Sequence, residues 1–251
     1  MRGAGPAIAL IGIGAAAWLL LRSPAGLGET GWWIIENGLS PQNLLPMVGL
    51  GIGCALVPAG ALIAGSALLA AGMLAAYWAE PVWYPLLSTL PDAAAHDFFA
   101  GPMASVAAGL ALIAGARLRP FLLPPAAFVV GFLSALWIRL TDPTLGSFSI
   151  TLAGLLCDLW VLVAVLLTLR AFRRPWFEIP ARIGGSWLVA IGLLHGGALL
   201  AQRDTLQPLE TPMPDQTYQP DPMLPPDGGD PFGGPGPSPD RSLFPDQPSV
   251  Y

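Results

Sequence analysis

The sequence predicts an all-α membrane protein: a polytopic bundle of six or seven transmembrane helices over residues 1–201, followed by an extended tail over residues 202–251. Two observations predict the bundle. Hydrophobic residues make up 54% of the chain and charged residues only 11%, whereas soluble domains carry about 25% charged residues. The apolar residues also gather in runs close to the roughly 20 residues that a helix needs to cross a bilayer. Lipid is therefore the expected environment of the bundle.

Six apolar runs give the expected helices in chain order. They are Pro6–Leu21, Leu44–Ala79, Gly101–Ala116, Phe121–Leu140, Ser149–Leu169 and Ile183–Ala201. The second run is too long for one untilted helix, and Pro58 near its middle either kinks a long helix or turns a hairpin of two short ones. The first run follows a basic Arg2, as in a signal peptide, but no clear cleavage site follows it, so we expect a retained helix.

The arginines predict the orientation of the bundle. Arg117 and Arg119 fall in one expected connection, and four more arginines lie between positions 170 and 182. Both segments lie on the same side of the membrane with six or with seven spans, and the positive-inside rule makes that side cytoplasmic. The loop over residues 80–100 carries acids and no arginine, as an outer loop can. We expect a bacterial inner-membrane protein with its C-terminal tail on the periplasmic side.

Aromatic residues mark the expected membrane interfaces. Trp32 and Trp33 follow the first apolar run, and amphipathic rings of this kind settle at the level of the lipid headgroups. The stretch Glu29–Leu39 around them is expected to form a short interfacial helix.

The tail differs from the bundle in composition. Thirteen of its fifty residues are proline, and it carries two arginines against eight acidic residues, a net charge of −6. Such a segment buries too little apolar surface to offset the entropy lost on folding, so we expect it to stay extended. It is either a solvated tail or a docking arm, in which spaced anchors such as Tyr218, Phe232 and Phe244 order on a partner.

Asp158 is the most informative residue for function. It lies near the centre of the fifth run, where an ionisable side chain costs several kcal/mol unless it faces the bundle interior and has a partner. His195 of the next run is the natural candidate: counted from the outer helix ends, the two residues lie roughly 13 and 9 Å deep. Consecutive helices are usually neighbours, so the two side chains are expected to meet. The pair either holds helices together or forms a proton or cation site.

His96 and Asp97 form a second candidate site in the outer loop. They are either solvated or capture a metal at the mouth of a permease, and a histidine here or at position 195 could also ligate a haem-type pigment. Cys54 and Cys157 lie inside apolar runs and are expected to be packing residues.

Motifs of conventional chemistry are missing from the sequence. There is no Gly-rich phosphate loop opening a helix, no nucleophile elbow and no His-Glu-x-x-His. We therefore expect no enzyme and assign no catalytic, cofactor-binding or metal-binding residue. The cofactor question stays open. The chain also has no basic patch for nucleic acid.

The segment Arg174–Leu194, RPWFEIPARIGGSWLVAIGLL, resembles the final helix of HupE/UreJ-like small bacterial integral membrane proteins. These are hydrogenase or urease accessory proteins thought to move nickel or cobalt. The resemblance covers about 20 of 251 residues. The early helices lack the family's His-rich, Asp-containing motif, so no ligand residue is carried over.

Two functions are therefore expected. The first is a non-catalytic accessory or assembly subunit of a larger membrane complex, with the tail used for docking to other membrane proteins. The alternative is a small-solute or metal-cation permease that uses Asp158 and His195.

Overall fold

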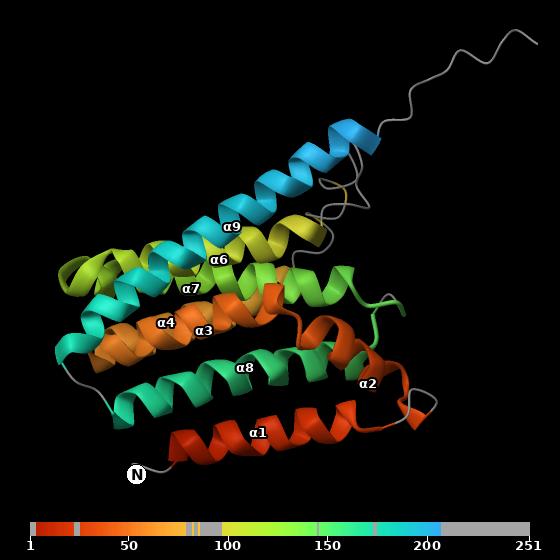
Figure 1. Ribbon diagram of the computed structural model, residues 1–251, viewed down its shortest axis with the longest axis horizontal. Helices are drawn as coiled ribbons and strands as arrows, with labels where there is room; N and C mark the ends of the chain where they lie inside the picture. The colour runs from red at the N-terminus through yellow and green to blue at the C-terminus, as the bar shows by residue number, and fades with distance from the viewer. Residues whose placement is uncertain are drawn as a thin grey trace, which may run out of the picture. The chain divides into compact units, whose positions relative to one another are not determined.

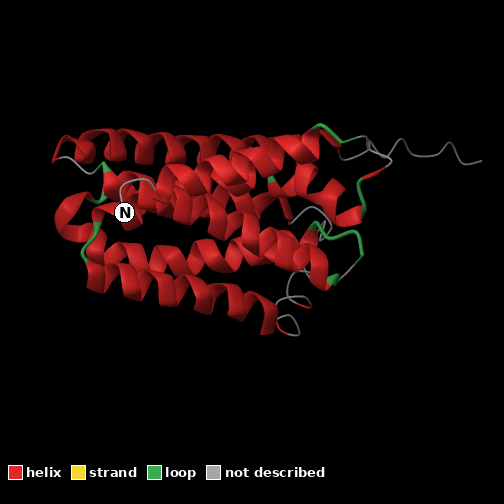
Figure 2. Ribbon diagram, turned by 90° about the horizontal axis from the view of Figure 1, so that it is seen from below, coloured by secondary structure: helices red, strands yellow, loops and turns green. Residues whose placement is uncertain are grey.

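The structure, a computed structural model, describes residues 4–22, 26–78, 82, 85, 97–144, 146–172 and 175–206. Within this part the chain forms eight α-helices and no strand, and Figures 1 and 2 show most of them running side by side as a bundle. The all-α prediction is confirmed. His96 and the tail anchors Tyr218, Phe232 and Phe244 lie outside the described residues.

The helices follow the predicted apolar runs with shifted ends. They are α1 (Ala4–Leu20), α2 (Glu29–Trp33), α3 (Pro41–Leu56), α4 (Ala59–Trp78), α6 (Asp97–Ile113), α7 (Gly115–Leu140), α8 (Phe148–Ala171) and α9 (Glu178–Leu206). A π-helical turn, η2 (Ile34–Gly38), continues α2, and a 3-10 turn, η4 (Pro175–Phe177), precedes α9. The last helix ends at Leu206, five residues beyond the predicted boundary at 201.

The long second run forms two helices, and the chain reverses direction between them. Near its start α3 meets Ser134 of α7, and near its end it meets Leu123. The next helix, α4, meets Leu123 first and Arg139 close to its own end. Because α3 and α4 contact α7 in opposite order, Pro58 lies at the turn of a hairpin and not in the kink of one long helix.

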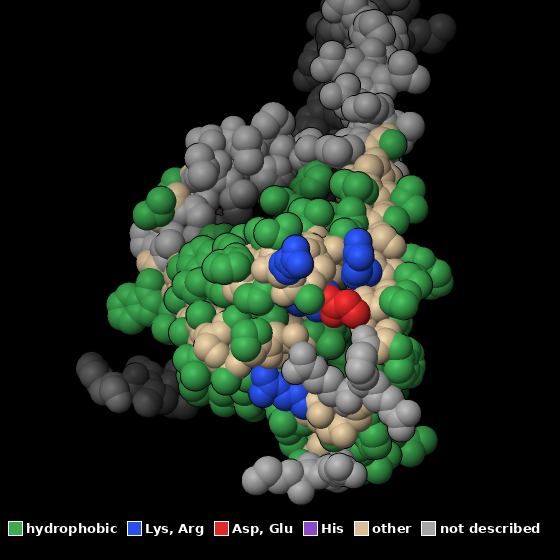
Figure 3. Space-filling view, turned by 90° about the vertical axis from the view of Figure 1, so that its left-hand side faces the viewer, with side chains coloured by type: hydrophobic (Ala, Val, Ile, Leu, Met, Phe, Trp, Pro, Cys, Tyr) green, Lys and Arg blue, Asp and Glu red, His purple; other side chains and the backbone are tan. Residues whose placement is uncertain are grey.

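Several of these helices can cross a membrane. In the described part, α4, α7 and α8 are each long and apolar enough, and a fourth candidate exists if the pair of Glu29–Gly38 and α3, bent by 66°, is one broken span. Large apolar side chains lie exposed on their surfaces, among them Ile63, Phe121 and Leu156. Figure 3 shows an end of the bundle on which green, hydrophobic side chains surround a few charged ones. These are the helices expected of a multi-pass membrane protein.

The main apolar core lies around α3. Its buried members come mostly from α3, α6, α7 and α8, including Leu50, Ala108, Leu123 and Leu162. Helix α4, which adds Ala61 and Leu69 to this core, packs along α7, while α9 packs along α6 and α1 packs along α8. The expectation that α8 and α9 are neighbours was wrong: α9 packs mainly on α6, and α3 contacts both α8 and α9.

Glycines allow the closest of these helix contacts. Gly109 of α6 and Gly185 of α9 face each other, and a Cβ added at Gly185 would lie 2.7 Å from Leu112 Cβ and 2.9 Å from the Gly109 carbonyl oxygen. On α3, a Cβ added at Gly49 would lie 2.5 Å from Leu188 Cδ1 of α9, and one added at Gly53 would lie 2.8 Å from Leu123 Cδ1 of α7. Small residues at these positions let neighbouring backbones approach, as in other membrane bundles.

The arginines expected in a connecting loop are part of a helix. Only a tight turn separates α6 from α7, and Gly115 in that turn adopts a φ of +70°, which glycine reaches without steric cost. The first turns of α7 therefore contain Arg117 and Arg119, and Arg119 is buried. Helix α7 thus starts earlier than its apolar run does.

Candidate functional site

The start of α3 brings polar side chains into the bundle interior. The chain bends by 66° between Glu29–Gly38 and α3. Ser40 is extended at this bend and Pro41 opens the helix, a position that suits proline because its nitrogen has no hydrogen to leave unpaired. Gln42 and Asn43 follow directly. Successive helical side chains point about 100° apart, so these two reach different neighbouring helices.

Asn43 joins Asp158 and Ser134 in a buried cluster, which we call the Asp158 cluster. The Asn43 amide Nδ2 donates a hydrogen bond of 2.7 Å to one carboxyl oxygen of Asp158, and the Ser134 hydroxyl donates to the other. Ser134 also lies 3.3 Å from Asn43 Oδ1, and Asn43 Nδ2 lies 3.3 Å from the Gly38 carbonyl oxygen. Asp158 is 0% exposed. The cluster therefore ties α3, α7 and α8 together around one buried carboxyl group.

His195 lies in a different contact from the one predicted for it. Its Nε2 is 3.1 Å from Nε2 of Gln42, whereas the hydrogen bonds of Asp158 go to α3 and α7. The structure thus does not pair Asp158 with His195: α3 contacts both α8 and α9 and contributes a partner to each residue. The sequence identified both residues as interior polar groups, but it gave no sign that Gln42 and Asn43 would be their partners.

Two cavities adjoin these polar groups. One, of about 200 Å³, lies between α3, α6 and α9 and is lined by Gln42, Ser105 and His195. A smaller one, with space for about one water molecule, is lined by Gln42, Asn43, Ser134 and Trp137. The Trp137 indole nitrogen is buried and has no hydrogen-bond partner among the described residues. Because Gln42 lines both cavities, it lies between His195, which it contacts, and the Asp158 cluster.

Trp33 fixes the short helix in front of this site. It is 1% exposed, and its indole nitrogen donates to the Thr141 carbonyl oxygen and hydroxyl, each at 3.2 Å. Its ring packs with Ile138 and Ile150. The prediction of an interfacial, lipid-level ring was therefore wrong for Trp33, whereas Trp32 is 53% exposed. The helix predicted over Glu29–Leu39 is present as α2 and η2.

A second buried aspartate, Asp142, lies in the loop between α7 and α8. Its carboxylate accepts hydrogen bonds from the backbone amides of Thr144, Gly146 and Ser147 at 2.8–3.0 Å and from the Thr144 hydroxyl at 2.6 Å. Burial of the charge opposes ionisation, but these donors prevail and hold the pKa of Asp142 below its ordinary value. Asp142 shapes the turn that starts α8. The sequence signal that could have identified Asp142 is its position directly before a Pro-Thr turn.

An ion pair ties α7 to α9 at the opposite end of the bundle. Arg119 Nη1 lies 2.8 Å from Glu178 Oε2, and Nη2 donates to the Leu112 carbonyl oxygen at 3.0 Å. Arg119 is 1% exposed and Glu178 is 32% exposed. This pair joins the first turns of α7 and α9 to the end of α6.

The remaining residues singled out in the sequence include Asp97, Cys54 and Cys157. Asp97 begins α6, and its side chain lies outside the described residues. Among residues the structure describes, no three His, Cys, Asp or Glu side chains lie together as a metal site requires. Cys54 is buried and Cys157 half-buried, and both are free thiols.

Comparison of the chain with protein-family models, with curated proteins and with solved structures returned no match.

Proposed function

We propose that the protein crosses the membrane seven times and serves as a non-catalytic accessory subunit of a larger membrane complex. The seven spans are α1, α3, α4, α6, α7, α8 and α9. The α3–α4 hairpin supports this count, because it divides the longest apolar run into two passes of opposite direction. Three of these helices are short: α1 has 17 residues, α3 has 16, and the apolar part of α6 is Phe99–Ile113, close to the lower limit of about 17 residues for crossing a bilayer.

The arginines support the orientation. Arg117 and Arg119 lie at the start of α7, Arg170 at the end of α8 and Arg182 near the start of α9. In the bundle these helix ends lie at one end (Figure 1). The positive-inside rule makes that end cytoplasmic, which leaves the N-terminus inside and the segment after α9 outside.

The Asp158 cluster carries the proposal of a subunit role. Both carboxyl oxygens of Asp158 accept hydrogen bonds from side chains of two other helices, and all three residues are buried. A buried polar network whose members satisfy one another fixes the arrangement of its helices. The Asp158 carboxyl group thus serves to hold a rigid bundle together, as a scaffold for other proteins requires. The acidic tail, with its spaced apolar residues, is the segment we propose for docking.

Affinity purification in mild detergent tests the subunit proposal. The full chain is compared with a chain that ends at Leu206, where α9 ends. The full chain is expected to retain a defined set of membrane proteins, and the shortened chain is expected to lose them while staying in the membrane fraction. If both forms run alone as monomers, the subunit proposal is wrong.

A second function, transport of protons or small cations, is supported by a different observation. Gln42 lines two cavities, one shared with His195 and one shared with Asn43 and Ser134 of the Asp158 cluster; the smaller one is also bordered by the Trp137 indole N–H, which has no partner in the described part of the chain. Polar groups that lead to a carboxyl group inside a membrane protein are typical of ion pathways. Asp158→Asn preserves the hydrogen bonds and removes ionisation. Under this alternative it abolishes uptake in proteoliposomes without loss of folded protein, and unchanged uptake excludes the alternative.

A further inference from the structure

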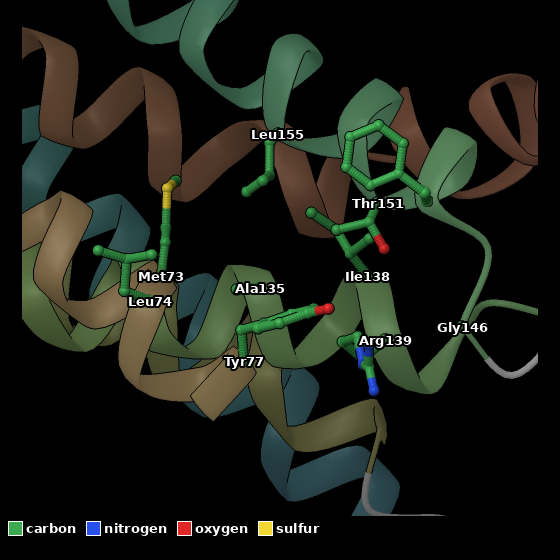
Figure 4. A pocket seen from close by; sticks show the side chains of 10 residues that line it. Met73, Leu74, Tyr77, Ala135, Ile138, Arg139, Gly146, Thr151 and Leu155 are labelled. Carbon is green, nitrogen blue, oxygen red and sulfur yellow. The ribbon is translucent and has the colours of Figure 1, made fainter. Parts of the chain in front are cut away.

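Two cavities of the bundle differ sharply in the chemistry of their walls. The one between α4, α7 and α8 has a volume of about 240 Å³. Figure 4 shows it framed largely by carbon, with walls that include Met73, Leu74, Ala135 and Leu155. Such walls offer a water molecule few hydrogen bonds. The smaller cavity beside the Asp158 cluster has only about 10 Å³, but its lining includes the polar side chains of Gln42, Asn43 and Ser134.

Trp137 supplies a hydrogen-bond donor at this small cavity. The residue lines the cavity and is 7% exposed. Its indole nitrogen is buried, and the described part of the chain offers it no acceptor. An indole N–H can only donate, and leaving a buried donor unpaired is costly. The position therefore calls for an acceptor inside the cavity.

Asn43 supplies the complementary acceptor. Its Oδ1 lies 3.3 Å from the Ser134 hydroxyl, but that hydroxyl has a single hydrogen and donates it to Asp158, the closer acceptor. The Ser134 hydrogen is thus not available to Asn43 Oδ1. Asn43 is 5% exposed, so its carbonyl oxygen is also shielded from bulk water. A buried acceptor and a buried donor therefore border the same cavity.

One water molecule satisfies both groups. It accepts a hydrogen bond from Trp137 and donates to Asn43, and the Gln42 amide group on the same wall is a partner for its second hydrogen. Buried waters make about three hydrogen bonds and need roughly 10–15 Å³ of space, which the cavity just provides. A cation fits the site poorly, because the indole N–H would present its positive end to it.

We propose that this cavity holds one ordered water molecule, which accepts a hydrogen bond from Trp137 Nε1 and donates one to Asn43 Oδ1. The water joins α7 to α3 beside the Ser134 contact and brings Trp137 into the hydrogen-bonded network of Asp158. The inference rests on the buried geometry alone, and it goes beyond both the subunit role and the transport alternative. In a rigid subunit this water completes the buried network, and in a transporter it hydrates the surroundings of the carboxyl group.

A structure of the full chain in lipid nanodiscs, at a resolution that shows ordered water, tests the site directly. An oxygen peak is expected within about 2.7–3.2 Å of both Trp137 Nε1 and Asn43 Oδ1. A cavity without this peak, in a map that shows other buried waters, overturns the inference. A peak that contacts only one of the two residues overturns it as well.

A change of melting temperature tests the same hydrogen bond in detergent solution. Trp137 is replaced by benzothienylalanine, which keeps the shape of the indole ring but carries sulfur in place of the N–H group. Loss of the hydrogen bond to water should lower the melting temperature by about 2–4 °C. The matched control is the same replacement at Trp33, whose indole N–H donates to Thr141 and which should show a similar drop. An unchanged or raised melting temperature for the Trp137 replacement, beside a drop for Trp33, would show that the Trp137 N–H is unpaired and would overturn the inference.

Discussion

Two buried aspartates of this protein differ in their hydrogen-bond donors: distant side chains for Asp158, and mainly backbone amides of its own loop for Asp142. Asp158, in the middle of α8, is bonded by side chains 24 and 115 residues away in the chain. Asp142, in the loop before α8, is bonded by groups two to five residues away. Both are almost fully removed from the surface, at 0% and 3% exposed. One carboxyl group organises tertiary packing and the other organises a single turn.

The difference lies in what the surrounding backbone can offer. Inside a helix, backbone N–H groups are already bonded to carbonyl oxygens four residues earlier, so a carboxyl group there needs side-chain donors from other helices. In a loop the backbone N–H groups are unpaired and can turn toward a nearby carboxylate. Loss of Asp158 should therefore affect the whole bundle, and loss of Asp142 should affect the start of one helix.

Replacing Asp158 is the change expected to have the largest effect. Asp158→Ala removes both acceptors and leaves the buried amide of Asn43 and hydroxyl of Ser134 without their partner. Each donor keeps only its longer contact of 3.3 Å, to the Gly38 carbonyl oxygen or to Asn43 Oδ1. Complete loss of a partner costs a buried group about 1–3 kcal/mol, so for partial loss at two groups we expect the unfolding free energy to fall by about 2–4 kcal/mol. Thermal unfolding in detergent measures it.

Asp158→Asn serves as the control for that experiment. An asparagine keeps an acceptor for Asn43, and its amide group can donate to the Ser134 hydroxyl, which accepts as readily as it donates. We expect less than about 1 kcal/mol of destabilisation. If Asn and Ala destabilise equally, the hydrogen bonds do not hold the three helices together.

Around Gly109 and Gly185, α6 and α9 are joined by close packing of their backbones, which sharpens the comparison. A Cβ added at Gly185 would lie 2.7 Å from Leu112 Cβ, whereas a Cβ added at Gly184 meets nothing within 4 Å. Gly185→Ala should therefore push α9 from α6 and cost about 1–3 kcal/mol, whereas Gly184→Ala should be neutral or slightly stabilising because alanine favours the helix. Thermal unfolding of the two variants in parallel checks this. Equal melting temperatures would contradict the close contact.

The sequence predicts the helices of this protein better than it predicts their neighbours. Apolar runs locate each long helix, because lipid-facing and core-facing residues alike must be apolar. The apolar runs predict the ends of the helices less well. Because Arg117 and Arg119 are charged, the first turns of α7 lie outside its apolar run, and α9 continues to Leu206, beyond its own run. The burial of the Asp158 carboxyl group was predictable from its depth in the apolar run.

The partners of Asp158 were not predictable in the same way. Asn43 directly precedes an apolar run, where a polar residue is usually assigned to a loop. Ser134 is a small residue in a long apolar helix, where serine is not a distinctive signal. Which helix lies beside α8 depends on the order of all the helices in the bundle. The rule that consecutive helices are neighbours failed because α3, far away in sequence, lies against α8 and also contacts α9.

Asp142 gives the smallest effect and a distinct dependence on pH. Its pKa is lower in the folded protein than its ordinary value of 3.8, so the unfolded chain binds the proton more tightly. The stabilisation by Asp142 is therefore fully present above that ordinary value and is lost as pH falls through it toward the lower folded pKa.

Asp142→Asn keeps the side-chain shape but has no carboxylate, and should cost about 1 kcal/mol at neutral pH. The difference in melting temperature between wild type and Asp142→Asn should stay constant from about pH 5 to 8 and shrink below about pH 4. A difference that persists at about pH 3 would show that the amides bind the side chain without regard to its charge.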